Sequence, residues 1–241
     1  TAAMIPKKIH YCWFGGAPFS RRIRRCMASW SHYCPGYELV RWDASNSPLS
    51  SSLYVRQAYQ AGQWAFVSDY VRLSALAEQG GIYLDTDMEL TAPLGPYRKH
   101  AAFLGFEAPD RVATCIIGAV PEHPFIQELL RSYAGRAFLR RDGSFDTTTN
   151  VAHVTGLLLQ KGLRPDGTRQ TVAGVSLYPA DYFSPKSLET GRILRSAHTA
   201  AIHHFQASWM TPRQRFHTKA AQWIGPAWTR RLKRGLGRED L

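Results

Sequence analysis

The chain has 241 residues and a formal net charge of +12, with 44% hydrophobic and 20% charged residues. These proportions are typical of a folded globular protein and exclude a chain that is disordered throughout. No apolar run approaches the roughly 18 residues of a membrane-spanning helix, and the first residues lack the apolar stretch of a signal peptide. The sequence therefore predicts a cytoplasmic protein with reduced cysteines, built as one large domain or two small ones.

Strands and helices alternate along the first 90 residues. Hydrophobic periodicity predicts strands over Lys8–Phe14 and Tyr37–Trp42, and helices over Ala17–His32, Ser50–Ala61 and Trp64–Gln79. A glycine pair, Gly80-Gly81, ends the last helix in the manner of a C-cap. Strands over Ile82–Asp85 and Met88–Leu90 follow.

The second half of the chain is less regular. It is predicted to contain strands and one clear helix, in the order Ala101–Phe106, Thr114–Val120, helix Pro124–Ala134, Val175–Tyr178 and Ala200–Phe205. Residues 136–170 are weakly patterned and indicate loop and short helix. The early alternation predicts an α/β fold with a mixed, mostly parallel sheet flanked by helices.

The sharpest motif is an aspartate pair, Asp85 and Asp87, at the end of a predicted apolar strand. Residues two apart on a strand point to the same side, so both carboxylates can face one ligand. Carboxylate oxygens suit Mg²⁺ or Mn²⁺, and either ion would neutralise a diphosphate. Ligands of open α/β sheets bind beyond the carboxyl ends of the strands, which is where this pair falls.

A second charged pair lies in the preceding helix. Asp69 and Arg72 are three residues apart and share a helix face, surrounded by Phe66, Val67 and Val71. A surface ion pair would contribute less than about 1 kcal/mol. The apolar neighbours instead favour a buried pair with a function.

Together these motifs resemble the signature of the family-32 glycosyltransferases and the catalytic domain of the large glucosylating toxins. The matching segments are residues 64–72 (WAFVSDYVR), 80–87 (GGIYLDTD), 5–16 (IPKKIHYCWFGG) and 202–209 (IHHFQASW). The resemblance implies a GT-A fold with a Rossmann-like nucleotide-sugar-binding domain. It further implies a nucleotide-sugar donor, a divalent metal and retention of the anomeric configuration.

The resemblance also implies roles for individual residues. Asp87 matches a direct metal ligand, and Asp85 matches the aspartate that contacts ribose, donor sugar and metal. His203 or His204 matches a C-terminal metal ligand, of which His203 is preferred because successive strand residues face opposite ways. The implied donor-binding residues are Trp13, Asp69, Arg72, Asp85, Ser208 and Trp209, with Trp13 stacking on the base and the last two near the diphosphate.

The acceptor side is less defined by the motifs. Glu107, Asp146 and Asn150 are candidates for it. In retaining transfer of this type the leaving phosphate can itself take the acceptor proton. The toxin-like Trp13 favours a UDP-sugar over a GDP-sugar, and the resemblance implies a glycan or lipid-linked acceptor in bacterial surface polysaccharide synthesis.

Three other functions fit the sequence less well. A glycoside hydrolase would place its two carboxylates on separate elements flanking the bond, unlike Asp85 and Asp87. A nucleic-acid-binding module would explain the positive charge, but no recognised nucleic-acid motif is present, so no such partner is expected. An inactive transferase is disfavoured by the complete set of metal-ligand residues.

The last 32 residues carry eight Lys or Arg and two acidic residues, which is half of the net charge. Tryptophans and leucines are interleaved with these cations. The sequence thus predicts a catalytic domain over residues 1–210 and a basic amphipathic tail over 211–241. Such a tail either packs against the catalytic domain or adsorbs to an anionic membrane, which would place the enzyme on the inner face of the bilayer.

Overall fold

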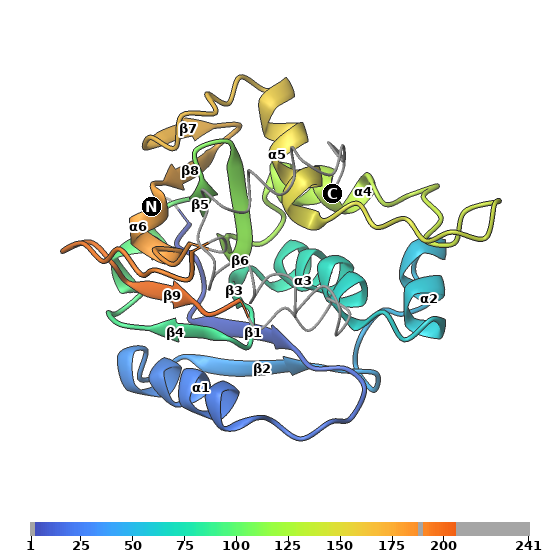
Figure 1. The fold of residues 1–241 in the computed structure, drawn as a ribbon, viewed down its shortest axis with the longest axis horizontal. Coiled ribbons are helices and arrows are strands. Elements are labelled where there is room, and N and C mark those ends of the chain that lie inside the picture. The colour runs from blue at the N-terminus through green and yellow to red at the C-terminus, as the bar shows by residue number, and fades with distance from the viewer. Residues whose placement is uncertain (1–2, 188–189, 206–241) are drawn as a thin grey trace, which may run out of the picture.

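A seven-stranded sheet in the order β2-β1-β3-β6-β5-β8-β7 forms the centre of the computed structural model, which describes residues 3–187 and 190–205 (Figure 1). Five strands run in one direction, and β6 and β7 run in the other. The predicted α/β fold with a mixed, mostly parallel sheet is therefore confirmed. The strands are β1 (Lys8–Cys12), β2 (Glu38–Trp42), β3 (Gly81–Leu84), β5 (Ala102–Ala108), β6 (Arg111–Ala119), β7 (Gln170–Val172) and β8 (Val175–Tyr178).

Helices cover both faces of this sheet because its strands bury side chains on alternating sides. On β3, Tyr83 points into one core, whereas Ile82 and Leu84 point into the other. The first core contains helices α2 (Leu53–Gln60), α3 (Trp64–Gln79), α4 (Pro124–Arg131) and α5 (Asn150–Gln160). The second contains α1 (Arg21–Tyr33) and α6 (Ala180–Phe183).

A two-stranded antiparallel sheet completes the second core. It pairs β4 (Met88–Leu90) with β9 (Ala201–His203), and we call it the β4–β9 ribbon. Helix α1 packs on this ribbon (Figure 1). Between them, Trp30 Nε1 donates to the Met88 carbonyl at 2.7 Å. Ribbon formation brings the end of the described chain back beside Asp87.

Local sequence explains where several helices begin and end. Ser20, Ser52 and Thr149 each accept a hydrogen bond from the backbone N–H three residues ahead, which caps α1, α2 and α5. Gly80 follows α3 with φ = 60°, in the left-handed region that favours glycine. A Cβ atom there would also collide with Pro121. The chain therefore turns sharply from α3 into β3, which leads directly to the aspartate pair.

The predicted elements agree with the structure apart from their boundaries and one region. The segment 136–170 contains α5, an 11-residue helix, as well as a bridge between Leu139 and Phe145. A short 3₁₀ helix, η1 (Gly95–Lys99), precedes β5. Among the described residues no helix is long and apolar enough to cross a membrane. The predicted tail 211–241 lies outside the described residues.

Candidate active site

Asp85, Asp87 and His203 form one group at the carboxyl end of β3. One ligand atom from each residue lies within 4.8 Å of those of the other two. His203 Nε2 is 3.3 Å from Asp87 Oδ1 and 3.9 Å from Asp85 Oδ2. Their side chains are only 11% to 26% exposed, so the group forms a partly enclosed set of two carboxylates and an imidazole. Such a donor set suits a divalent cation.

The β4–β9 ribbon explains why one histidine joins this group and its neighbour does not. His203 pairs in register with Met88, immediately after Asp87, and its ring reaches the two aspartates. The adjacent His204 lies on the other side, where its Nε2 is 2.7 Å from Glu89 Oε2. Of the two predicted alternatives, only His203 lies with the aspartates.

The pKa of His203 also reflects its position. Burial by itself would lower this pKa, but the negative charge of Asp87, the Cys115 side chain and the hydrogen bonds to both together outweigh burial and hold the pKa well above its usual value. A histidine must be neutral to bind a metal, so cation binding here would release a proton.

Arg72 connects the aspartate group to the α3 helix. Its guanidinium is 2.9 Å from Asp69 Oδ1 and 3.3 Å from Asp85 Oδ1, and its side chain is 6% exposed. It also donates to the Thr114 carbonyl at 2.7 Å. The prediction of a buried pair with Asp69 agrees with this geometry. The contact with Asp85 could not be inferred from the spacing of Asp69 and Arg72.

Tyr83 is a further residue that sequence reasoning missed. Its hydroxyl donates to Asp85 Oδ1 at 3.0 Å, and the Arg72 guanidinium lies over its ring at 4.4 Å. Tyr83 and Arg72 thus hold Oδ1 of Asp85, while Oδ2 is the oxygen that lies toward His203. The spacing of Tyr83 and Asp85 could have predicted this contact, because residues two apart on a strand point to the same side.

Asp69 stands where the N-terminus of α5 reaches α3. Burial raises the pKa of Asp69 to about 6, with Asp85 adding to the shift and Arg72 opposing it. The backbone N–H of Asn150 donates to Asp69. Within the described part of the chain, neither amide atom of the buried Asn150 side chain has a hydrogen-bond partner. Two polar side chains that could serve a sugar are therefore side by side.

Because the pKa of Asp69 is about 6, we expect donor affinity to fall as the pH is lowered from 7 to 5. Below pH 6 the carboxyl gains a proton, and with it loses both acceptor strength and the ion pair with Arg72. Donor affinity measured against pH in saturating metal would show a step near pH 6. In Asp69→Asn that step should be absent. A step of the same size in this variant would contradict the predicted role of Asp69 in donor binding.

Trp13 lies at the same edge of the sheet, directly after β1. Since β1, β2 and β3 are parallel, their carboxyl ends meet there. Its indole N–H donates to the Ala17 carbonyl at 2.7 Å, and its ring is 4.7 Å from that of Phe19. The side chain is half-buried, so its ring position is held by the loop that follows β1.

The other predicted residues separate into three groups. Glu107 is close enough to His203 and Asp85 to sense their charges; burial raises its pKa, Asp85 adds to this, and His203 opposes it. Asp146 is 2.8 Å from Arg136 and 3.3 Å from Arg140, and is thus engaged in structural ion pairs. Ser208 and Trp209 lie outside the described residues, and their roles stay predictions.

Comparison with known proteins agrees with this site. Residues 20–104, from α1 through the aspartate pair to β5, match the family described as "Glycosyltransferase sugar-binding region containing DXD motif". The match includes Asp69, Arg72 and the DXD pair Asp85 and Asp87, so these residues lie in a glycosyltransferase sugar-binding region. Residues 20–104 thus form a DXD-containing glycosyltransferase region of the family-32 type, which agrees with the resemblance of the motifs.

Three curated relatives illustrate the match. Subversion of eukaryotic traffic protein A of Legionella pneumophila is 30% identical over 118 residues, covering 38% of this chain and 18% of that protein. Mannosyl phosphorylinositol ceramide synthase CSH1 of Saccharomyces cerevisiae is 30% identical, covering 41% and 27%. Inositol phosphoceramide mannosyltransferase 3 of Schizosaccharomyces pombe is 27% identical, covering 57% and 39%. The matched part of the chain spans less than two fifths of each relative.

Solved structures that superpose on the chain are also glycosyltransferases. The PaToxG glycosyltransferase is 17% identical with a TM-score of 0.48, covering 66% of this chain and 70% of its own. A galactosyltransferase in complex with donor and acceptor sugar analogues is 12% identical with a TM-score of 0.45, covering 90% and 94%.

Proposed function

We propose that the chain is a metal-dependent, retaining glycosyltransferase that moves a sugar from a UDP-sugar to a glycan or lipid-linked acceptor. A GDP-sugar is the alternative donor. The observation that carries the proposal is the single charged network in which Arg72 contacts both Asp69 and Asp85, while Asp85 and Asp87 contact His203. This network connects three possible metal ligands to the buried Asp69–Arg72 pair, which is suited to bind sugar hydroxyls.

The residues present fit a divalent cation, preferably Mn²⁺, since an imidazole joins two hard carboxylates. Asp85, Asp87 and His203 would hold it. When bound, the cation neutralises the diphosphate that departs from the sugar. Tyr83 and Arg72 orient Asp85 for this task, because both hold its Oδ1. Asp69 and Asn150 would receive sugar hydroxyls, and Trp13 would stack on the base.

The first experiment is a donor screen. The purified chain is incubated with Mn²⁺ and a panel of nucleotide sugars, and release of free nucleotide is measured. Release from a UDP-sugar that stops in EDTA would support the proposal. Nucleotide release unaffected by EDTA would contradict the role of the metal, and release only from GDP-sugars would correct the donor.

The two adjacent histidines provide a matched test of metal binding. We expect His203→Ala to weaken Mn²⁺ affinity at least about tenfold, since even loss of an outer contact to a metal ligand costs that much. His204→Ala should leave Mn²⁺ affinity unchanged, because His204 faces Glu89. Titration of both variants with Mn²⁺ measures the difference. Equal affinities would remove His203 from the ligand set.

For the acceptor, we propose a surface glycan or its lipid-linked precursor. One relative is, by its name, an inositol phosphoceramide mannosyltransferase and another a mannosyl phosphorylinositol ceramide synthase, and both names refer to a lipid with a polar head. Glu107 lies beside the metal-ligand group and is the acceptor-side residue we favour over Asp146. The proposed setting is the cytoplasmic face of a bacterial membrane, in polysaccharide synthesis.

The basic tail over residues 211–241 extends this proposal. Its cations and aromatic residues suit adsorption to an anionic bilayer, which would bring the domain over 1–210 to a lipid-linked acceptor. Sedimentation with phosphatidylglycerol vesicles would compare the full chain with one ending at Thr211. Salt-sensitive binding that requires the tail supports adsorption, and equally weak binding by both chains would contradict it.

A further inference from the structure

A second charged feature lies on the other side of the β4–β9 ribbon from the metal-ligand group. A cavity of about 280 Å³ opens there between α1, the ribbon and the segment near Arg195. We call it the basic pocket. Its polar lining consists of Arg22, Arg25, Glu89, Arg195 and His204, and Ile202 forms part of its base.

The register of the ribbon separates this pocket from the metal-ligand group. Glu89 pairs with Ile202, and both line the basic pocket. Met88 pairs with His203, which faces Asp85 and Asp87 instead. Because neighbouring residues on a strand point to opposite sides, the two sites are distinct although His203 and His204 are adjacent.

Charge in the basic pocket is not balanced by its own residues. Among the described residues that line the pocket, Glu89 is the only carboxylate, and it is shared between Arg25 at 3.5 Å and His204 at 2.7 Å. Within residues 3–187 and 190–205, neither Arg22 nor Arg195 forms an ion pair. The three arginines and Glu89 together carry a formal charge of +2.

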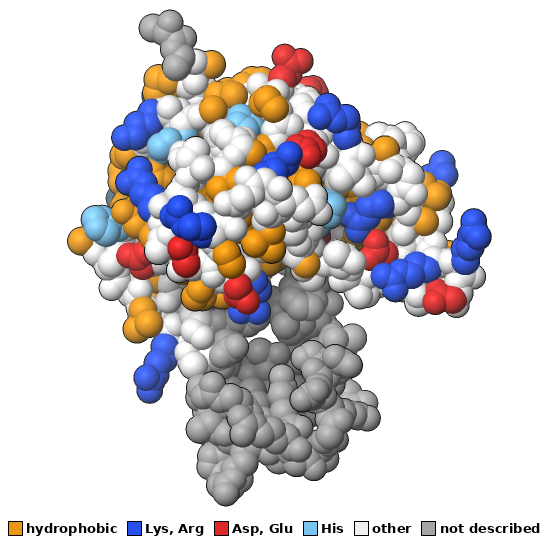
Figure 2. All heavy atoms as spheres, turned by 90° about the horizontal axis from the view of Figure 1, so that it is seen from above, with side chains coloured by type: hydrophobic (Ala, Val, Ile, Leu, Met, Phe, Trp, Pro, Cys, Tyr) orange, Lys and Arg blue, Asp and Glu red, His pale blue; other side chains and the backbone are white. Residues whose placement is uncertain are grey.

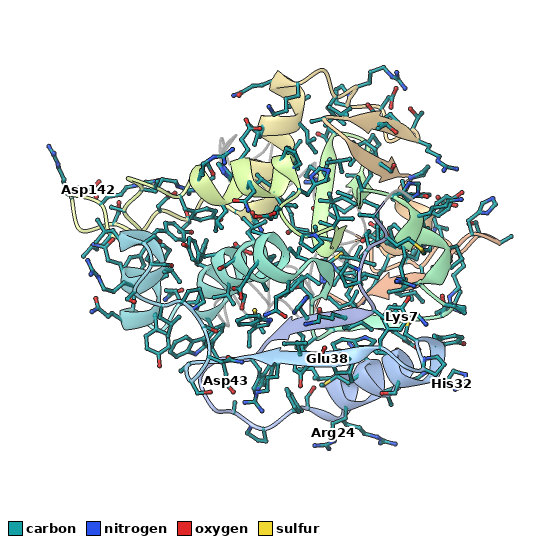
Figure 3. All side chains as sticks on the ribbon, turned by 180° about the vertical axis from the view of Figure 1, so that it is seen from behind. Lys7, Arg24, His32, Glu38, Asp43 and Asp142 are labelled. Atoms are coloured by element: carbon teal, nitrogen blue, oxygen red, sulfur yellow. The ribbon has the colours of Figure 1, made fainter. Side chains whose placement is uncertain are left out.

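A fourth cation lies between the two sites. Lys186 Nζ donates to the His204 carbonyl at 2.9 Å. Burial lowers the pKa of Lys186, the like charge of Arg22 lowers it further, and Asp87 opposes the shift. Lys186 is thus within electrostatic reach of the basic pocket and of the metal-ligand group. Elsewhere, Arg and Lys side chains are dispersed among other residues, as on the face in Figure 2, and Arg24 of α1 points outward (Figure 3).

The size and charge of the cavity define its ligand. At about 280 Å³ it lies just below the roughly 300–1,000 Å³ typical of cofactor sites, so it is too small for a whole nucleotide sugar. Guanidinium groups bind phosphate through paired hydrogen bonds, and a phosphate dianion would balance the charge of +2. A carboxylate would leave half of that charge uncompensated.

We propose that the basic pocket binds the phosphate group of a second ligand, distinct from the nucleotide-sugar donor. The phosphate belongs either to a small phosphorylated molecule or to a phospholipid headgroup. Both present phosphate oxygens to Arg22, Arg25 and Arg195, a small phosphomonoester as a dianion and a phosphodiester headgroup as a monoanion. The proposal does not require the transfer reaction, since the pocket shares no described side chain with the metal-ligand group.

Calorimetric titration of the full chain with inorganic phosphate and glycerol 3-phosphate, in EDTA, tests the proposal. The double variant Arg22→Gln/Arg195→Gln should bind these probes at least tenfold more weakly. The matched control is Arg21→Gln/Arg192→Gln, which removes two exposed arginines that do not line the pocket. It should bind within about twofold of the unmodified chain.

Vesicles distinguish the two sources of phosphate. Sedimentation with phosphatidylglycerol in phosphatidylcholine is compared between the two double variants. If only Arg22→Gln/Arg195→Gln loses vesicle binding, the ligand of the pocket is a phospholipid headgroup. Binding of the soluble probes with no such difference on vesicles assigns it to a small phosphorylated molecule. If no probe binds, or if both double variants lose binding equally, the proposal is overturned.

Failure of this inference can be told apart from failure of the proposed function. Arg22→Gln/Arg195→Gln should retain Mn²⁺-dependent UDP binding, because its changes lie off the metal-ligand group. Conversely, Asp87→Ala should lose that binding and retain binding of the phosphate probes. If both variants lose binding of UDP and of the phosphate probes alike, the two sites are one site. This result also overturns the inference.

Discussion

Asp87→Ala is expected to abolish sugar transfer while leaving the fold intact. The side chain is 11% exposed and reaches His203 Nε2 at 3.3 Å, so alanine removes one of three groups that would hold the cation. A metal that stabilises the departing diphosphate contributes several kcal/mol at the transition state. We therefore expect a fall in turnover of about 10³-fold or more, equivalent to ~4 kcal/mol.

The measurement is turnover at saturating donor over a range of Mn²⁺ concentrations, with thermal unfolding to verify folding. Asp142→Ala is the matched control, since Asp142 lies at the exposed tip of the loop between α4 and α5 (Figure 3). Near-normal turnover of Asp87→Ala, or turnover that persists in EDTA, would remove the metal from the mechanism.

Arg72→Ala is expected to lower both stability and activity. Its guanidinium contacts Asp69, Asp85 and the Thr114 carbonyl in a nearly buried setting, so alanine leaves two carboxylates without their shared counter-charge. Breaking a buried ion pair by removing one partner typically costs 3–5 kcal/mol. We expect a loss of about this size in the free energy of unfolding, because partial exposure of Asp85 moderates the penalty but the Thr114 carbonyl adds to it.

Stability alone does not separate an active-site role from a structural one, so Arg72→Lys is the informative variant. Lysine keeps the charge but lacks the planar fork that reaches both Asp69 and Asp85. We expect Arg72→Lys to fold and to bind Mn²⁺, with donor turnover reduced at least about tenfold. Normal turnover would make the arginine purely structural. A double-mutant cycle with Asp69→Asn would then measure how strongly the two residues are coupled.

Local sequence was sufficient for the elements around the site. The period of Val67, Val71 and Ala75 predicted α3 over the range observed, Trp64–Gln79, and the glycine pair predicted its end. The apolar run before Asp85 predicted β3. These are short-range properties, governed by side-chain periodicity and by the φ angle that Gly80 can adopt. The match to the DXD-containing glycosyltransferase region covers these same motifs.

Other features depended on residues far apart in the chain. The contact of His203 with Asp87 requires the β4–β9 pairing, which joins segments more than 110 residues apart. The direction of β6, which runs against its neighbours, also depends on pairing and not on local pattern. The resemblance predicted His203, with His204 as the alternative, as a metal ligand, and the register of the ribbon is what turns His203 toward the aspartates.

What the sequence determined by itself was therefore the chemistry: two carboxylates at a strand end, an Asp69–Arg72 pair one turn apart, and a histidine near the last described strand. The tertiary structure decided which atoms meet. Arg72 reaches Asp85 because α3 packs against β3, and Tyr83 holds the same oxygen because it shares a side of that strand. It also decided that Arg22 and Arg195, 173 residues apart, line one pocket. Salt screens electrostatic interactions beyond a short distance, so cations act on one ligand only when the fold brings them together. Here the packing of α1 against the ribbon brings them together.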